Sequence, residues 1–539
     1  YTLSLHDALP ISVPTGDRAP AHGKRAPVRR GFGPPVFVGF DCEWKYVAKG
    51  RNALLSVQFY VIGPTGERYG KVIEFFGRRA VQDRPALAEA LSELLDEAEA
   101  ACVFEEWPCE LVFCGHFTRG DISVFRDFKA FRHQLQAVNG TFATTAAPAE
   151  LKLPLKDEQV ARLKHRYRYV VGDDFDPRLL SVRLVDSARL APPGTALSKI
   201  GDWLGVPKIK LPPGFRKSEI DRLQRERPEL FRAYGLRDAE IAVLFVLWVF
   251  WFCDRYLGIK GLSATASALS VRLVQMCMRR DGVHPDVALN FEKVRRWRWN
   301  ETTGRPVSKT QRMPTRVRRW FEAFFADVYM GGRNECYWFG PTPMPQPSHR
   351  LFDHDLAACY VVSLAGIMCL DYDRIEITRD VARFIGHVAG YAEVEFRFPE
   401  GTRFPCLAVM MEKYGLWYPL SGVALATAPE IELAVNMGAQ IKIRFGIVIP
   451  WKDRAAVFAE SAPRLRQSET RTKGDDAPWL EPEGKVFVPT PGMRFPPESH
   501  GDVGYRPFES GAIYTRAMRL KFDKKSLPHQ FMKLVGNGV

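Results

Sequence analysis

The sequence predicts an α/β fold, a mixed sheet with flanking helices, for residues 36–257. Apolar, β-branched and aromatic runs recur at 36–44, 53–62 and 70–76, which is typical of an antiparallel meander of strands. Runs with helical spacing then alternate with further strand-like runs. A segment of this length can bury a hydrophobic core of its own.

Local signals place the later elements of this segment. Proline is favoured in the first turn of a helix, so Pro85 and Pro228 mark two helix starts. The apolar run 241–253 is too short to span a bilayer and predicts a buried helix. We therefore expect helices at 86–101, 197–204 and 228–253, and strands at 111–114 and 180–186.

Composition restricts the function classes. The chain has 539 residues and a formal net charge of +14, which favours a polyanionic partner, either nucleic acid or an anionic membrane. Its ten cysteines include no Cys-x-x-Cys pair, which argues against a zinc finger and fits reduced thiols in the cytoplasm. No signal peptide is visible.

Two segments are expected to lie outside the folded domains. Residues 1–12 resemble translated sequencing-adapter read-through, and residues 13–35 are rich in Pro, Gly and Arg. We therefore expect 1–35 to be a disordered lead-in. Residues 462–509 are polar and Pro-rich without periodicity, which predicts a mobile insertion.

Asp41 and Glu43 are the first candidate site residues, at the end of a short apolar strand. Because strand side chains alternate between faces, both point to the same side, beneath Gly39. Two such charges repel unless a cation lies between them, and oxygen ligands suit Mg²⁺ or Mn²⁺ rather than zinc. For this pair alone, a solvated strand end is the alternative interpretation.

Three further polar residues follow in the same segment. Asp121 comes soon after the strand at 111–114. Tyr234 and Asp238 are four residues apart and therefore share one face of the helix that begins at Pro228. Taken singly, each of these residues could be an ordinary surface residue. Only their order within one domain makes them a candidate set of site residues.

In this order the residues resemble the 3′–5′ proofreading exonuclease domain of family-B DNA polymerases, which has a ribonuclease-H-like fold. Asp41 and Glu43 match its first motif, Asp-x-Glu. Asp121 matches the closing Asp of the second motif, and Tyr234 and Asp238 match the third, Tyr-x-x-x-Asp. The domain would span 36–257.

The resemblance implies a two-ion site. Two Mg²⁺ or Mn²⁺ ions would clamp the attacking and leaving oxygens of an in-line phosphoryl displacement. The Tyr234 hydroxyl would orient the attacking water. His116, where the second motif often has Asn, and Phe117 would contact a frayed primer end. The implied metal ligands are Asp41, Glu43, Asp121 and Asp238.

Residues 258–328 are interpreted as a basic connector that contacts DNA. Between Arg279 and Trp320 there are 12 Lys and Arg against four Asp and Glu. Trp297, Trp299 and Trp320 lie among these charges and could stack on bases or pack beneath arginines. The alternative is a solvated basic loop with structural tryptophans.

Residues 329–539 resemble a partial α+β polymerase palm that enters the fingers. Segments 404–407 and 418–430 are expected to form palm strands that lead into a helix. Tyr-x-Gly-Gly is the motif that family-B polymerases, notably protein-primed ones, place between exonuclease and palm to hold the template strand. The DNA-binding residues implied here are Tyr329, Gly331, Gly332 and Arg333.

Asp355 and Tyr360 resemble polymerase motif A, Asp-x-x-Ser-Leu-Tyr-Pro, at the end of a strand expected at 351–356. Asp355 would be a metal ligand, and Tyr360 would stack under the incoming sugar. The Ser, Leu and Pro of the motif are not matched. Asp353 lies on the same strand face and is a rival ligand, although the five-residue step to Tyr360 favours Asp355.

Lys533 and Asn537, one helical turn apart, resemble the start of motif B, Lys-x-x-x-Asn-Ser-x-Tyr-Gly, on the fingers helix. Lys533 would bind nucleotide phosphates, with Arg519 as a candidate helper. The sequence stops at Val539, before the Tyr-Gly of the motif. Motif C, which follows motif B in the family, is therefore expected to be absent, and this fragment to retain at most excision and DNA binding.

The sequence thus predicts a family-B DNA polymerase, truncated at its C-terminus, with a proofreading exonuclease. Its implied partners are primer-template DNA, single-stranded DNA and deoxynucleotides, and no membrane. The sequence leaves two points open. One is whether a terminal protein primes synthesis, and the other is whether the setting is organellar rather than bacterial, phage or plasmid. Two rival hypotheses remain, a stand-alone exonuclease with a DNA-binding extension and a non-catalytic DNA-binding replication relic.

Overall fold

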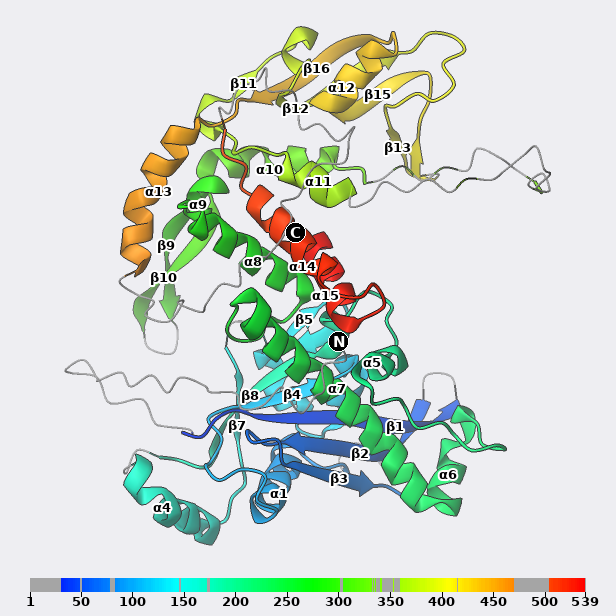
Figure 1. Ribbon diagram of the computed structural model, residues 1–539, viewed down its shortest axis with the longest axis vertical. Helices are drawn as coiled ribbons and strands as arrows, with labels where there is room; N and C mark the ends of the chain where they lie inside the picture. Colours follow the sequence, from blue (N-terminus) through cyan, green and yellow to red (C-terminus); the bar gives the residue numbers. More distant parts are fainter. Residues whose placement is uncertain are drawn as a thin grey trace. The chain divides into compact units, whose positions relative to one another are not determined.

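The computed structural model divides the chain into two compact units (Figure 1). Among the residues that the structure describes, the first unit holds 31–271 and 518–538, and the second holds 272–469 and 504–517. Within 31–538 the residues that are not described are 49–50, 78–82, 145–146, 172–174, 301–303, 332, 334, 336–339, 342–351, 353–358, 414 and 470–503.

The first unit contains a mixed six-stranded sheet in the order β3-β2-β1-β4-β8-β7 (Figure 1). Its strands are β1 (Val36–Ala48), β2 (Arg51–Ile62), β3 (Arg68–Glu74), β4 (Leu111–Gly115), β7 (Ala149–Lys152) and β8 (Leu179–Asp186), with a small hairpin of β5 (Gln136–Val138) and β6 (Thr141–Ala143). Its helices are α1 (Leu87–Ala100), α2 (Thr118–Asp121), α3 (Phe128–Phe131), α4 (Asp157–Val171), α5 (Leu197–Leu204), α6 (Ile220–Glu226), α7 (Pro228–Leu257) and α15 (Leu527–Asn537).

The expected mixed sheet with flanking helices is confirmed, and its pairing follows the sequence. Strands β1, β2 and β3 form the expected antiparallel meander. Strand β1 then pairs in parallel with β4, and β4 with β8, while β7 closes the sheet antiparallel. One expectation was wrong, because β1 does not end at the carboxylates but continues to Ala48 through its pairing with β2.

The two faces of β1 meet different helices. Val36, Val38, Phe40 and Cys42 belong to the hydrophobic core that the apolar face of α1 also joins. The alternate side chains face α7, where Phe37 packs edge-on against Phe250 with ring centroids 5.9 Å apart. Because the alternation has a period of two, Asp41 and Glu43 lie on the α7 face.

The start of the described chain also differs from expectation. Phe32 lies in the segment expected to be disordered, yet its ring packs against Tyr167 and Phe175 with centroid distances of 4.9 and 5.6 Å. The Gly33 amide donates a hydrogen bond to the Trp107 carbonyl at 2.9 Å. The hydrophobic contact of Phe32 explains why the fold begins before residue 36.

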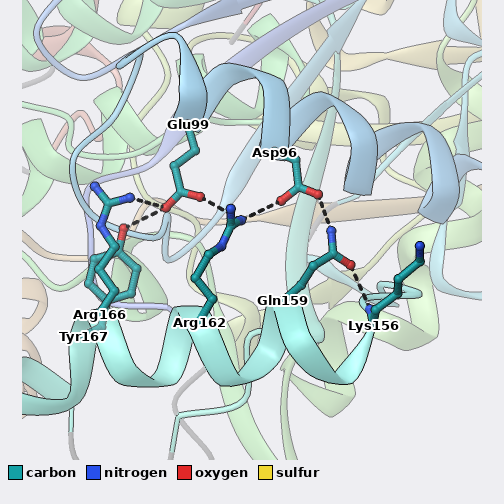
Figure 2. Close-up of polar contacts among 7 residues, drawn as sticks. All are labelled: Asp96, Glu99, Lys156, Gln159, Arg162, Arg166 and Tyr167. Atoms are coloured by element: carbon teal, nitrogen blue, oxygen red, sulfur yellow. Dashed lines mark hydrogen bonds and ion pairs between the residues drawn. The ribbon is translucent and has the colours of Figure 1, made fainter.

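Polar contacts join α4 to α1 (Figure 2). Glu99, buried on α1, accepts hydrogen bonds from Arg166 at 2.7 Å and from the Tyr167 hydroxyl at 3.3 Å. Arg162 bridges Asp96 at 3.3 Å and Glu99 at 3.4 Å. Since a buried carboxylate needs partners, this network fixes where α4 packs.

Helix α15 packs against the C-terminal half of α7 within the first unit. The Phe531 ring meets Trp248 and Phe252 edge-on, with centroid distances of 5.4 and 5.5 Å. Gly258 ends α7 in the left-handed conformation, a common helix terminator. Although α7 is long and largely apolar, no helix in the described part of the chain is long and apolar enough to cross a membrane.

The second unit is built on a four-stranded antiparallel sheet in the order β11-β16-β12-β15, with α12 packed on it. The strands in this part of the chain are β9 (Phe291–Asn300), β10 (Arg305–Pro314), β11 (Glu376–Ile377), β12 (Ala389–Arg397), β13 (Val409–Met411), β14 (Gly415–Trp417), β15 (Ser421–Thr427) and β16 (Gln440–Ile449). The helices are α8 (Ala266–Arg280), α9 (Pro285–Ala288), α10 (Arg316–Val328), α11 (Cys359–Ala365), α12 (Ala428–Asn436), α13 (Arg454–Glu469) and α14 (Glu509–Leu520).

Some expectations for this unit are confirmed and others were wrong. Strand β15 leads into α12, as expected, but 404–407 forms no strand, because Pro405 has no amide to donate to a ladder. Part of the insertion expected at 462–509 is instead folded, since α13 extends to Glu469 and Tyr505 is buried, and residues 470–503 lie outside the described part of the chain. The strand expected at 351–356 falls outside the described residues apart from Phe352, which is not in a strand.

Candidate active site

Asp41, Glu43 and Asp238 converge at one place in the first unit. One carboxylate oxygen of each lies within 4.8 Å of the others. The first two project from β1 and the third from α7, so residues almost 200 positions apart in the sequence share one site. Asp238 is buried, and Asp41 and Glu43 are partly exposed.

Two glycines allow this approach. A Cβ on Gly39 of β1 would lie 2.1 Å from the Ala239 carbonyl oxygen, so only glycine lets α7 cross the strand this closely. A Cβ on Gly235 of α7 would lie 2.4 Å from Nε2 of Gln58, a buried side chain of β2. The close crossing brings Asp238 down to the level of the β1 carboxylates.

Burial raises the pKa of all three carboxylates, and neighbouring carboxylates raise two of the pKa values further. For Asp41, burial raises the pKa well above its usual value, and the neighbouring charges of Asp121, Glu43 and Asp238 raise it further. Burial and then Asp238 raise the pKa of Glu43 to about 8. Burial likewise raises the pKa of Asp238, although Lys208 opposes this. Full ionisation of the cluster would therefore place more negative charge here than its surroundings compensate.

Asp121 lies beside this group but outside the tight cluster of three. It ends α2, one helical turn after β4. The Trp44 indole Nε1 donates to its Oδ1 at 3.5 Å. Burial raises the pKa of Asp121 to about 7, while the bond from Trp44 lowers it. Trp44 therefore helps to orient the carboxylate.

Lys208 and Tyr234 complete the site. The Lys208 ammonium donates to Asp238 Oδ2 at 2.5 Å. Tyr234 is buried, and its pKa is raised first by burial and then by the charges of Glu43, Asp238 and Asp41. The phenol therefore stays protonated at neutral pH and faces the carboxylates as a neutral hydroxyl group.

His116 and Phe117 are held by a neighbouring strand end. The buried Asp186, at the end of β8, accepts hydrogen bonds from the backbone amides of Phe117 at 3.0 Å and Thr118 at 2.9 Å. His116 Nδ1 is 2.9 Å from Ser187 Oγ. This anchoring keeps Phe117 in the left-handed region, at φ 67°, with the residue 57% exposed.

The predicted polymerase residues of the second unit are only partly described. Tyr329 and Tyr360 are 82% and 78% exposed. Gly331 has a φ of 76°, which glycine tolerates. Arg333 donates to the Pro405 carbonyl at 2.8 Å, and its guanidinium lies 3.9 Å from the Tyr418 ring centroid. Three predicted residues lie outside the described part of the chain: Gly332, Asp353 and Asp355.

The predicted nucleotide-binding residues near the end of the sequence lie in the first unit. Lys533 and Asn537 are both exposed on α15, one turn apart. Arg519 is half-buried, and its Nε donates to His529 Nε2 at 3.0 Å, while His529 Nδ1 is 3.0 Å from the Arg519 carbonyl. Part of its guanidinium is therefore engaged within the protein.

Sequence reasoning missed Lys208, Asp186 and the role of Trp44. Lys208 lies in an irregular Pro-rich and Lys-rich loop with no motif that could identify it. Asp186 could have been found, because it ends a strand parallel to β4, opposite Gly115. Parallel strands bring their carboxyl ends to the same edge of a sheet, where functional loops gather.

Comparison with known proteins finds a relative in sequence. No protein-family model matches the chain. The primer-independent DNA polymerase PolB of Escherichia coli is 32% identical over 451 residues, which is 81% of this chain. The chain spans about half the length of this relative, 51%.

Two solved structures of Phi29 DNA polymerase are similar at low identity. A complex with primer-template DNA matches at 13% identity and a TM-score of 0.40, covering 82% of this chain and 65% of that one. A complex with primer-template DNA and incoming nucleotides matches at 11% identity and a TM-score of 0.38, covering 92% and 68%. The chain is thus a relative of the DNA polymerase PolB over most of its length, in agreement with the family-B polymerase that its motifs predict.

Proposed function

We propose that the first unit is a ribonuclease-H-like 3′–5′ exonuclease and that the whole protein is a proofreading DNA polymerase. The observation that carries the first part is the convergence of Asp41, Glu43 and Asp238, with oxygens within 4.8 Å of one another. Asp121, Lys208 and Tyr234 surround this cluster. Similarity to PolB supports the second part.

The donor set fits divalent cations. It consists of carboxylate oxygens without thiol or imidazole, the ligand type that Mg²⁺ and Mn²⁺ prefer. The raised pKa values of Asp41 and Glu43 indicate negative charge that a bound cation would compensate. Bound as a pair, such ions supply charge stabilisation at the attacking and leaving oxygens of a phosphodiester.

The surrounding residues have separate tasks in this proposal. Asp41, Glu43, Asp121 and Asp238 would hold the cations. The neutral Tyr234 hydroxyl orients the water that attacks phosphorus, and the 3′ oxygen leaves with a proton from solvent. Lys208 holds Asp238 in place by the 2.5 Å ion pair, and Trp44 does the same for Asp121. The chain thus contributes position and charge, which dominate phosphoryl transfer.

Phe117 and His116 are proposed to receive the DNA end. An exposed aromatic ring can stack on an unpaired base but not on one enclosed in a duplex. Asp186 presents the Phe117 ring by bonding its amide, and the Arg189 guanidinium lies 5.9 Å from that ring. A single-stranded 3′ terminus would therefore be preferred over a paired one.

Synthesis is proposed for the whole protein. Primer-template DNA and deoxynucleotides would be its substrates, with Asp355 as a metal ligand, Tyr360, Lys533, Asn537 and Arg519 at the nucleotide, and Tyr329, Gly331, Gly332 and Arg333 at the template. Incubation with primer-template DNA and deoxynucleotides tests this part separately from excision.

The exonuclease proposal is tested with 5′-labelled single-stranded DNA. We expect a ladder of 3′-shortened products in Mg²⁺ and none in EDTA, and we expect Asp41→Ala to remove the ladder. Glu229→Gln is the matched control, because this carboxylate lies on the first turn of α7 and is 88% exposed. If Asp41→Ala shortens DNA as fast as the parent, the site assignment is wrong.

A further inference from the structure

The basic connector contains a two-stranded antiparallel ribbon. Strands β9 and β10 pair along their whole length, with Trp297 opposite Ser308 and Trp299 opposite Pro306. In the described residues neither strand pairs with another sheet. The sequence placed no strands here, because the charged side chains hide the alternation that usually identifies a strand.

The end of the ribbon at Phe291 and Pro314 is anchored by contacts within the protein. The Arg312 guanidinium donates to the buried Asp286 at 2.5 Å and lies 3.7 Å from the Phe291 ring centroid. Arg318 donates to the Leu289 carbonyl at 2.6 Å, and Arg319 pairs with Glu292 at 3.4 Å. These arginines are engaged within the protein and stabilise the ribbon.

The other end of the ribbon, where Asn300 pairs with Arg305, carries exposed aromatic rings on one face. Directly opposite residues of an antiparallel pair share a face, so Trp297 and Trp299 lie on the same side as Ser308 and Arg295. The two indoles are 61% and 64% exposed. Arg295 donates to Ser308 Oγ at 2.9 Å and lies 4.6 Å from the Trp297 ring centroid, which restricts the ring.

The spacing of the rings suits nucleotide bases. Residues two apart on a strand are separated by about 6.6 Å, and bases in one strand follow each other at about 3.4 Å. The two rings therefore lie about two base steps apart, so each can stack on a base of the same strand. Bases in a duplex have both faces covered by their neighbours, so stacking requires a single strand.

The charges complement a phosphate backbone. Lys293 is exposed on the tryptophan face, and Arg296 and Arg298 are exposed on the opposite face. Within the described residues none of these three forms an ion pair, so their charge is available to phosphates. A protein partner would need an acidic surface that also covers two tryptophans, whereas single-stranded nucleic acid supplies phosphates and aromatic faces together.

We propose that the β9–β10 ribbon is a binding site for single-stranded DNA, with bases stacked on Trp297 and Trp299 and phosphates on Lys293 and the neighbouring arginines. The proposal takes DNA as the substrate from the proposed function but uses residues outside the carboxylate site. The ribbon would hold the strand independently of metal.

The test measures fluorescence anisotropy of fluorescein-labelled oligo-dT and of a labelled hairpin duplex, in EDTA so that no DNA is degraded. Trp297→Ala with Trp299→Ala is expected to weaken oligo-dT binding at least about tenfold, since one stacked base is lost at each site. Duplex affinity should change less than about twofold. Replacement of both tryptophans by Phe should retain most of the oligo-dT affinity, because the aromatic faces remain.

Trp417→Ala is the matched control, since this indole is 56% exposed in β14 and outside the ribbon. It should leave oligo-dT binding unchanged. Lys293→Ala should weaken both DNAs alike and reduce the slope of log K against log salt by about 0.7 for the single strand. Thermal melting confirms that each variant is folded.

The ribbon proposal is overturned if the Ala pair binds oligo-dT like the parent, which would leave the tryptophans to a protein partner. It is also overturned if the Phe pair loses as much affinity as the Ala pair. If DNA is shortened normally while the Ala pair binds like the parent, only the ribbon proposal fails. If the ribbon binds oligo-dT as expected but no DNA is ever shortened, only the exonuclease proposal fails.

Discussion

The carboxylate site and the β9–β10 ribbon concentrate charge in opposite ways. At the site, Asp41 and Glu43 of β1 lie close to Asp238 of α7. Burial raises the pKa of all three carboxylates, and repulsion by neighbouring carboxylates raises the pKa values of Asp41 and Glu43 further. On the ribbon, Arg296 and Arg298 are exposed to water. Buried like charges cost stability until a ligand compensates them, whereas exposed charges cost little.

The largest effect should come from the site. Asp41→Asn with Glu43→Gln keeps the shapes but removes two charges, and we expect exonuclease activity to fall by about 10³-fold or more. In EDTA the same variant should unfold at a higher temperature than the parent, because a repulsion has been removed. Glu229→Gln, an exposed carboxylate on α7, should change neither quantity.

A ligand site is distinguished from a structural ion cluster by a loss of activity that is accompanied by a gain in stability. A structural role predicts that activity and melting temperature fall together. Isothermal titration with Mn²⁺ adds an independent measurement, since the double variant should lose binding heat even where activity is not assayed. Binding heat equal to that of the parent would contradict the ligand assignment.

The pH dependence of stability gives the second test. The pKa of Glu43 is raised to about 8 and that of Asp121 to about 7, against about 4.3 and 3.9 in an unfolded chain. Between these values the folded chain retains protons that the unfolded chain has lost, so metal-free stability falls as pH rises from about 4 to 8.

Mg²⁺ should reverse this loss, because it binds the ionised carboxylates of the folded state. We expect melting temperatures in EDTA to decline towards pH 8 and the gain on adding Mg²⁺ to be larger at pH 8 than at pH 6. The Asp41→Asn and Glu43→Gln pair should show a flatter pH profile in EDTA. A metal-induced gain that does not change with pH would contradict the proposed linkage.

The third test concerns the backbone that builds the site. A Cβ at Gly39 would meet the Ala239 carbonyl at 2.1 Å, and backbone cannot move aside as a side chain can. We expect Gly39→Ala to cost about 1–3 kcal/mol of unfolding free energy and to lower activity by displacing Asp238. Gly70→Ala is the control, because its Cβ would meet only the flexible Leu236 side chain at 3.2 Å.

Denaturant unfolding with parallel activity assays separates the two glycines. If both substitutions cost the same free energy, the close crossing of α7 over β1 is not what limits the site. If Gly39→Ala is destabilised but fully active, the position of Asp238 does not depend on this crossing.

These contrasts also explain what the sequence could predict about the site. The period of two places Asp41 and Glu43 on one face of β1, and the four-residue step places Tyr234 and Asp238 on one face of α7. Both are local rules. That the two faces meet depends on the absent side chain of Gly39, a tertiary contact that no local pattern contains.

Lys208 and the ribbon were hidden for different reasons. Lys208 lies in an irregular loop, so neither a helical nor a strand period could orient it towards Asp238. Strands β9 and β10 form a ribbon whose two faces both contact water, so the apolar alternation that usually identifies a strand is absent. The cysteines and bulk charge restricted the function class but placed no residue.

The smallest expected effect distinguishes two arginines of the ribbon. Arg298 is exposed and makes no ion pair with the described residues, so Arg298→Ala should change the unfolding free energy by about 0.5 kcal/mol or less. Arg312 pairs with the buried Asp286 and covers Phe291, so Arg312→Ala should cost several times more, about 1–3 kcal/mol. In DNA binding, Arg298→Ala should still reduce the salt slope for oligo-dT by about 0.7. Urea unfolding of both variants, together with a salt titration of DNA binding, separates the two roles. If both variants are equally destabilised, Arg298 also holds the ribbon together, and its charge is then not free for phosphates.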